Sequence, residues 1–172
     1  MTNAITASIN FVPGSITEMP DLPGSDLLWL KAKRKSGIDR FNDLGLPTTR
    51  IEGWKYTNLK PLEGSRFQPT SVDDGMAVID KVPSLLNSSD SHRLVFVNGR
   101  IRNSFEIKAD LPEGVQLESL TDVLAENPEW IENHLGNLTD DSLALVQLNM
   151  AMLDTGFLLK VAPGVVVDRP IE

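Results

Sequence analysis

The chain has 172 residues, no cysteine and two histidines, and its 16 basic against 24 acidic side chains give a net charge of −8. The missing cysteines exclude disulfides, Cys-ligated zinc and Cys-ligated iron–sulfur clusters within these residues. Proteins that follow nucleic-acid phosphates need clustered Lys and Arg, so the acidic balance argues against a nucleic-acid partner. Apolar residues at 41% and charged residues at 23% are typical of a globular domain.

The negative charge is not spread evenly. Residues 87–172 carry six basic and fourteen acidic side chains, whereas residues 1–86 carry ten of each. No apolar run approaches the ~18 residues of a membrane-spanning helix, and no basic region followed by an apolar stretch opens the chain. We therefore expect a cytoplasmic protein without a membrane partner.

The first predicted element is a helix that follows a lead-in, residues 1–24, which is rich in Pro and Gly and expected to be flexible. Ser25 or Asp26 can cap the helix, and Gly45 with Pro47 can end it. Its inward positions at helical spacing are Leu27, Leu30, Arg34, Ile38 and Phe41. The cations Lys31, Lys33, Arg34 and Lys35 are interpreted as a solvated face.

Strand signals dominate the middle of the chain. Residues 76–80 read as a short strand, and residues 83–91 as a linker. Two β-rich runs, 93–97 and 100–107, flank Asn98-Gly99, a pair that supplies both positive φ angles of a type I′ turn and so predicts a β-hairpin. A further strand is expected at 115–118.

Helices and then strands are predicted toward the C-terminus. One helix should start at Ser119 or Thr121, a second at Asn127-Pro128, and a third at Thr139 with Asp140 and Asp141 in its first turn. The apolar stripe of the third helix is Leu143, Val146, Met150 and Leu153. Residues 157–161 and 165–167 are β-rich runs around Pro163-Gly164, and such apolar strands need sheet neighbours.

Candidate chemistry is sparse. His134 lies near a helix end beside Ile131 and Leu135, which is typical of a partly buried or dipole-stabilising histidine, and His92 at a strand entrance is expected to be exposed. No G-x-S-x-G, H-E-x-x-H or phosphate-binding glycine motif occurs. A small α/β hydrolase or a metal-dependent enzyme that uses His92 or His134 with acidic neighbours stays open as the alternative.

The most distinctive segment follows Pro47 and reads R-I-E-G-W-K-Y-T. If it is extended, Arg50 and Glu52 can pair, Trp54 and Tyr56 share one face, and Lys55 points the other way. Such an aromatic pair usually anchors a loop to a core, which favours a structural role. A partner-binding patch is the alternative.

The segment G-L-P-T-T-R-I-E-G-W-K-Y-T-N-L-K-P-L resembles the signature near the start of SufD proteins, subunits of the Suf iron–sulfur cluster assembly machinery. Further segments are similar to that family in the same order: F-N-D-L-G-L-P, L-V-F-V-N-G-R-I, L-A-L-V-Q-L-N-M-A-M-L-D-T-G and L-L-K-V-A-P-G-V-V-V-D-R-P-I. The residues that match the signature are Arg50, Glu52, Trp54, Lys55, Tyr56 and Thr57.

The resemblance implies an α+β fold. It comprises an N-terminal helical and small α/β domain, residues 25–156, with a β-hairpin, and then residues 157–172 as the first strands of a truncated right-handed parallel β-helix. It implies a non-catalytic scaffold subunit that works with SufB and SufC, with no catalytic, metal or cofactor-binding residue in this chain. The SufB branch is the nearer alternative. The terminal strands, whose partners would lie in later β-helix rungs, could also pair in a homo-oligomer.

Overall fold

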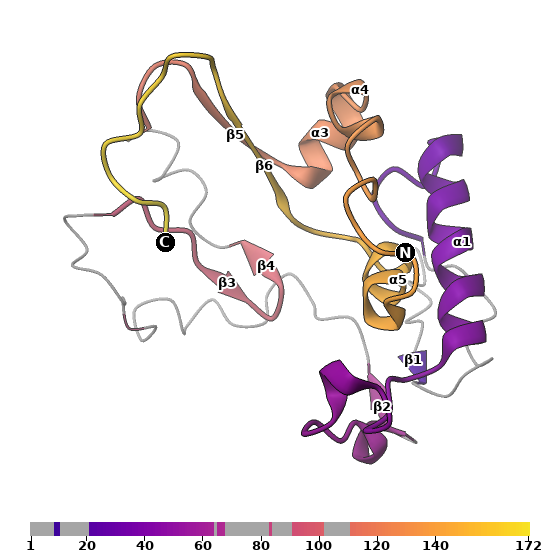
Figure 1. The fold of residues 1–172 in the computed structure, drawn as a ribbon. Helices are drawn as coiled ribbons and strands as arrows, with labels where there is room; N and C mark the ends of the chain where they lie inside the picture. Colours follow the sequence, from indigo (N-terminus) through magenta and orange to yellow (C-terminus); the bar gives the residue numbers. More distant parts are fainter. Residues whose placement is uncertain (1–8, 11–20, 64, 68–82, 84–90, 102–110) are drawn as a thin grey trace, which may run out of the picture. The chain divides into compact units, whose positions relative to one another are not determined.

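The computed structural model describes residues 9–10, 21–63, 65–67, 83, 91–101 and 111–172 (Figure 1). These residues form two compact units. The helical unit combines Met1–Pro69 with Pro128–Leu153, and the strand unit combines Thr70–Asn127 with Asp154–Glu172. Helices and small antiparallel sheets make an α+β fold, as predicted. The expected strand at 76–80 and residues 84–90 of the expected linker at 83–91 lie outside the described residues, and the predicted domain boundaries stay a prediction.

Helix α1, Leu28–Leu44, is the longest element of the helical unit. Its buried positions are Leu30, Arg34, Gly37, Ile38 and Phe41, which confirms most of the predicted inward face. Gly45, with φ of 69°, ends the helix, and its amide donates to the Phe41 carbonyl. The start differs from the prediction. The N-cap residue is Leu27, no side chain caps the helix, and the Ser25 hydroxyl donates to Asp21 instead.

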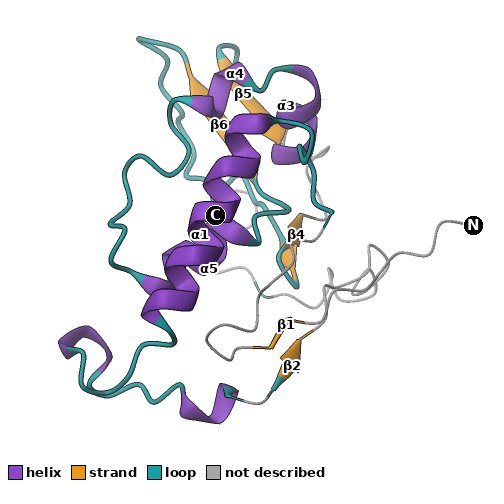
Figure 2. Cartoon of the chain, turned by 90° about the vertical axis from the view of Figure 1, so that its right-hand side faces the viewer, coloured by secondary structure: helices purple, strands orange, loops and turns teal. Residues whose placement is uncertain are grey.

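Helix α5, Ala144–Ala151, packs against α1 (Figures 1 and 2). The predicted start at Thr139 is wrong: Thr139 donates to the Gly136 carbonyl, and the helix begins five residues later. The predicted stripe is also wrong, since the buried residues are Ala144, Gln147 and Ala151. Small side chains on this face let the two backbones approach, and a Cβ on Gly37 would lie 2.7 Å from the Gln147 carbonyl oxygen.

The core of the helical unit is the cluster of Ile38, Phe41, Leu46, Ala144 and Ala151. Leu59, Leu62, Leu145, Leu148 and Met152 pack around it. Smaller elements of the same unit are α4, Glu129–Glu132, the 3-10 turns η1, Glu52–Trp54, and η2, Lys60–Leu62, and an antiparallel pair of β1, Ile9–Asn10, with β2, Arg66–Phe67. Helix α4 follows Pro128, as predicted.

Arg34 is wholly buried in the helical unit and is therefore not part of a solvated face. Its Nη2 donates to two backbone carbonyls, those of Pro23 at 2.8 Å and Leu153 at 2.6 Å. Carbonyl oxygens accept from the guanidinium where no water reaches it. The buried cation thus ties both the entry to α1 and the exit from α5 to one side chain.

The strand unit is built on a long-range antiparallel pair. Strand β5, Val115–Ser119, runs against β6, Phe157–Val161, with Leu117 opposite Leu159. The expectation that β6 finds its partners only in later β-helix rungs is wrong for this strand. Helix α3, Leu120–Glu126, follows β5 directly, and Ser119 caps it by accepting from the Asp122 amide at 3.0 Å, as predicted.

The predicted hairpin is confirmed by β3, Phe96–Val97, and β4, Arg100–Ile101, which pair around Asn98 and Gly99 with φ of 53° and 82°. Its predicted extension over residues 102–107 lies outside the described residues. Arg100 donates to Asp154 at 3.0 Å, and the rings of Phe96 and Phe157 lie 5.9 Å apart. The hairpin is therefore tied to the start of β6.

Residues 165–167 do not form the predicted strand. Instead, the last residues run parallel to the segment that precedes β3, with an isolated bridge between His92 and Ile171. The His92 amide donates to the Pro170 carbonyl at 2.8 Å, and the Glu172 amide donates back to the His92 carbonyl at 2.8 Å. A segment of this chain thus supplies the partner that the terminal residues were expected to lack.

Candidate functional site

The turn segment, Thr48–Glu63, contains the whole R-x-E-x-W-K-Y-T pattern and is the first candidate site. It is not extended, so the pairing that an extended segment would allow does not apply: η1 covers Glu52–Trp54 and η2 covers Lys60–Leu62. The Trp54 amide donates to the Ile51 carbonyl, and the Thr57 amide donates to the Trp54 carbonyl, both at 2.9 Å. The backbone therefore satisfies its own polar groups through consecutive turns.

Most signature side chains face solvent. Tyr56 is 92% exposed, and Arg50, Glu52, Lys55 and Thr57 are exposed as well. Trp54 alone is partly buried. Tyr56 is therefore not the predicted core anchor.

The aliphatic side chains of Leu59 and Leu62 anchor the turn segment, because both pack against the core of the helical unit. Sequence reasoning treated this L-K-P-L stretch only as part of the family pattern. Its leucines at a spacing of three, flanking Pro61, were the available signal for a short helical turn with one apolar face.

The cations of the turn segment lack acidic partners nearby. Within the part of the chain that the structure describes, Arg50, Lys55 and Lys60 make no ion pair, whereas Lys35 pairs with Asp39 and Arg40 with Asp141. The Lys55 Nζ lies 5.5 Å from the centre of the Tyr56 ring, a distance at which the ring face attracts a cation. The segment thus presents an aromatic ring next to a positive charge.

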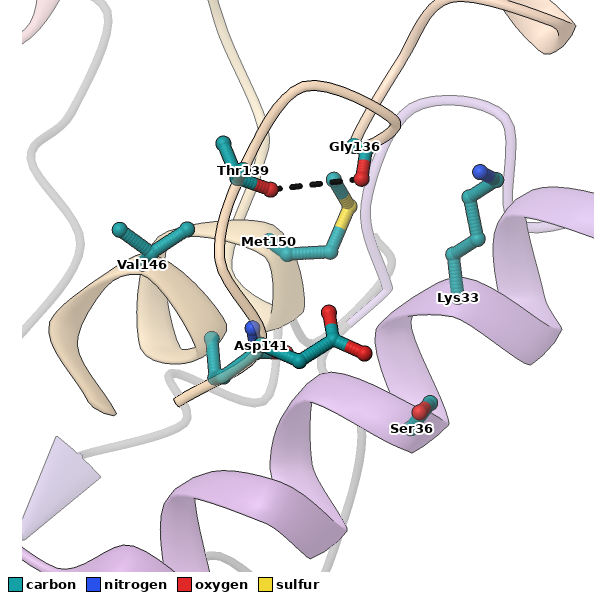
Figure 3. A pocket seen from close by; sticks show the side chains of 8 residues that line it. Lys33, Ser36, Gly136, Thr139, Asp141, Val146 and Met150 are labelled. Carbon is teal, nitrogen blue, oxygen red and sulfur yellow. Dashed lines mark hydrogen bonds between the residues drawn. The ribbon is translucent and has the colours of Figure 1, made fainter. Parts of the chain in front are cut away.

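A second candidate is a pocket of about 240 Å³ in the helical unit (Figure 3). Its lining comprises Lys33, Ser36, Gly136, Thr139, Asp141, Val146, Gln147 and Met150. Helix α1 provides Lys33 and Ser36, α5 provides Val146 and Met150, and the loop between α4 and α5 closes one side (Figure 3).

The charged groups of this pocket already hold the loop. The Lys33 Nζ donates to the Leu135 carbonyl at 2.7 Å and to the Asn137 side-chain oxygen at 3.0 Å. Asp141 accepts from Arg40 at 3.3 Å. These bonds fasten the loop to α1, so the pocket has a structural explanation.

Asp140 and Asp141 were interpreted from sequence as residues of a helix start. Asp140 instead accepts from the Ser142 amide at 2.8 Å in a turn before α5. The hydrogen bonds from Ser142, the backbone one first, hold the pKa of Asp140 below its usual value. Asp140 therefore belongs to a turn rather than to a helix start.

The two histidines occupy environments opposite to those predicted. His92 is 1% exposed in the strand unit, and its Nδ1 lies 3.5 Å from the Arg169 guanidinium. His134 is exposed and belongs to the helical unit. Among the described residues, no three His, Asp or Glu side chains gather as a metal site.

No helix within the described ranges is long and apolar enough to cross a bilayer.

Comparisons with known proteins concern most of the chain. The model of the SufBD protein N-terminal region matches residues 23–172. An iron-sulfur cluster assembly SufBD family protein from Synechocystis sp. (strain ATCC 27184 / PCC 6803 / Kazusa) is 27% identical over 161 residues, which are 92% of this chain and 35% of the relative. The chain thus spans about a third of the length of the curated relative it matches. No solved structure matches it.

Proposed function

The chain belongs to the SufBD family through the N-terminal region of these proteins, and we propose that it acts as a non-catalytic scaffold domain in iron–sulfur cluster assembly. The observation that carries the proposal is the family match across residues 23–172, which includes the turn segment, the hairpin and both strands of the β5–β6 pair. The curated relative bears the name of an iron–sulfur cluster assembly protein.

Within the family, we assign the chain to the SufD branch rather than to the SufB branch. The compact W-K-Y-T pattern at residues 54–57 supports this choice. Its partners in the proposal are a SufB-like and a SufC-like subunit, in the cytoplasm. The domain itself carries no cluster, flavin or metal.

Self-association through the C-terminal strands remains part of the proposal. Phe157, Leu159 and Val161 alternate along β6 and therefore share one face of the strand, and each is more than a third exposed. Among the described strands, β6 pairs with β5 alone. Apolar strand residues that stay exposed favour association with another strand.

Copurification tests the partner assignment. Tagged SufB-like and SufC-like subunits are mixed with this chain or with the full-length Synechocystis relative, which serves as the longer control. Capture of the chain by either subunit supports a direct scaffold contact. Capture of the relative alone would reduce the domain to an accessory of the longer protein, and capture of neither would contradict the scaffold proposal.

Metal analysis tests the proposed absence of a cluster. After anaerobic reconstitution with iron and sulfide, the desalted chain is expected to retain neither in stoichiometric amount. Stoichiometric iron and acid-labile sulfide would overturn this part of the proposal.

A further inference from the structure

We propose that the turn segment, Thr48–Glu63, is a docking surface for an acidic segment of a protein partner. This inference goes beyond the scaffold function, because it assigns a place and a chemistry of contact to one loop. It rests on the exposure of the segment, on its fixed backbone and on its charge.

The backbone of the turn segment is arranged before any partner arrives. The Ile51 amide donates to the Thr48 carbonyl at 3.0 Å, and the Glu63 amide donates to the Lys60 carbonyl at 3.0 Å. Between these turns, the Lys60 amide donates to the Asn58 side-chain oxygen at 3.0 Å. A surface that is ordered in advance loses less conformational entropy on binding than a loop that must order.

The core holds the turn segment from one side only. Leu59 and Leu62 pack against the cluster that contains Phe41 and Leu46, whereas Ile51 and Tyr56 are 52% and 92% exposed. The exposed surface of Ile51 and Tyr56 can therefore be buried when a partner binds to the segment. Tyrosine and arginine are also enriched among the residues that dominate binding energies.

The charge of the turn segment selects an acidic partner. The segment holds three cations, Arg50, Lys55 and Lys60, against two carboxylates, Glu52 and Glu63, which gives it a net charge of +1 in a chain whose net charge is −8. Among the described residues, these three cations form no ion pair. Lys35 and Arg40 of α1, in contrast, pair with aspartates. Carboxylates of a partner would complete the pairing.

A protein segment fits this surface better than a nucleic acid. Duplex DNA carries one charge per ~1.7 Å and is bound by long arrays of cations. Three cations within one short segment cannot provide such an array, and the acidic remainder of the chain repels a polyanion. Repulsion beyond ~8 Å is screened at physiological salt, so a short acidic peptide is affected far less.

Binding of a fluorescein-labelled poly-L-glutamate of short peptide length to the whole chain, measured by anisotropy at low and physiological salt, tests the proposal. The test variant is Arg50→Gln/Lys55→Gln/Lys60→Gln. The matched control is Lys31→Gln/Lys35→Gln/Arg40→Gln on α1, which removes the same charge from exposed positions. Circular dichroism verifies that both variants fold.

The turn variant is expected to bind poly-L-glutamate about tenfold more weakly, since it loses three exposed ion pairs with the probe. The α1 variant should lose less than about twofold. A further variant, Tyr56→Ala, should weaken binding at physiological salt, where the contribution of the ring persists after charges are screened.

Four results would overturn the inference. These are no binding of poly-L-glutamate at low salt, equal losses in the turn and α1 variants, tighter binding of poly-uridine than of poly-L-glutamate, and a drop in molar mass by light scattering when the turn cations are removed. The last result would identify the occupant as a second copy of this chain.

Discussion

The α1–α5 pair and the turn segment belong to the same helical unit, yet they reverse the usual placement of charged and aromatic residues. In the helix pair, the cation Arg34 has no exposed surface, and in the turn segment the aromatic Tyr56 is 92% exposed. The difference follows from the backbone. The carbonyls of Pro23 and Leu153 accept from Arg34, whereas the turns of residues 48–63 satisfy their own amides.

In the helix pair, backbone carbonyls accept hydrogen bonds from the buried Arg34. In the turn segment, backbone amides and carbonyls bond to one another, and the ring of Tyr56 stays exposed. Residue type alone therefore does not decide burial in this protein. Substitutions at a buried position of one region and at an exposed position of another test this comparison, because their effects on stability should differ.

The largest contrast is between the two aromatic positions. Phe41→Ala should lower the free energy of unfolding by about 4 kcal/mol, because a fully buried ring leaves a cavity. Tyr56→Ala should change it by less than about 0.5 kcal/mol. Urea denaturation measures both. A loss above about 2 kcal/mol for Tyr56→Ala would mean that the ring packs in solution.

Arg34→Met tests the buried cation. It should cost about 3 kcal/mol, because the buried guanidinium is removed and the partly buried carbonyls of Pro23 and Leu153 lose their donor. The matched variant Lys35→Met, one position along α1 on the exposed face, should stay within about 0.5 kcal/mol. If thermal melting gave both variants the same stability, the guanidinium contacts would contribute nothing to the fold.

Gly37→Ala tests the close approach of α1 and α5. The new Cβ would lie 2.7 Å from the Gln147 carbonyl oxygen and 3.1 Å from the Ala151 nitrogen, and both are backbone atoms. Overpacking should outweigh the gain in helix propensity and leave a net loss of about 2 kcal/mol.

Gly53→Ala is the matched control for Gly37→Ala. Gly53 belongs to η1 in the turn segment, and nothing lies within 4 Å of its added Cβ. Stability should be unchanged or slightly raised. Equal losses at Gly37 and Gly53 would contradict the tight packing of the helix pair.

Asp140→Asn should have the smallest effect, and one that depends on pH. The hydrogen bonds from Ser142 lower the pKa of the folded carboxyl, so the stabilisation is present above the ordinary value of 3.8 and is lost as the pH falls through the lowered pKa. Asparagine cannot titrate, so parent and variant should differ near neutral pH and converge in acid. Urea midpoints across this range measure the convergence, and a gap that stays constant with pH would contradict the assignment.

Local patterns predicted local structure well. The hairpin at residues 96–101 follows from Asn98-Gly99, the end of α1 from Gly45, and the start of α3 from Ser119, since each signal acts within a few residues. The sequence identified the signature residues as a motif, but it did not predict the 3-10 turns of the segment in which they lie. A motif of alternating aromatic and polar residues is compatible with an extended segment, whereas the segment forms 3-10 turns and packs Leu59 and Leu62 against the core.

The features that sequence could not predict depend on distant partners. The buried face of α5 consists of Ala144, Gln147 and Ala151, of which Gln147 and Ala151 lie against Gly37, although larger apolar residues outline a different stripe. Burial of Arg34 requires a carbonyl 119 positions away. Burial of His92 requires the C-terminal residues to lie beside it.

The chain passes from one unit to the other three times, after residues 69, 127 and 153. Neither unit is consequently a continuous stretch of sequence, and no single cut of the gene or of the polypeptide releases either one intact. Strand β5 cannot pair with β6 during synthesis until α3, α4 and α5 have also been made, because these helices lie between the two strands in the sequence. A ribosome must therefore expose the chain as far as residue 153 before the helical unit can close, and as far as β6 before the strand unit can close.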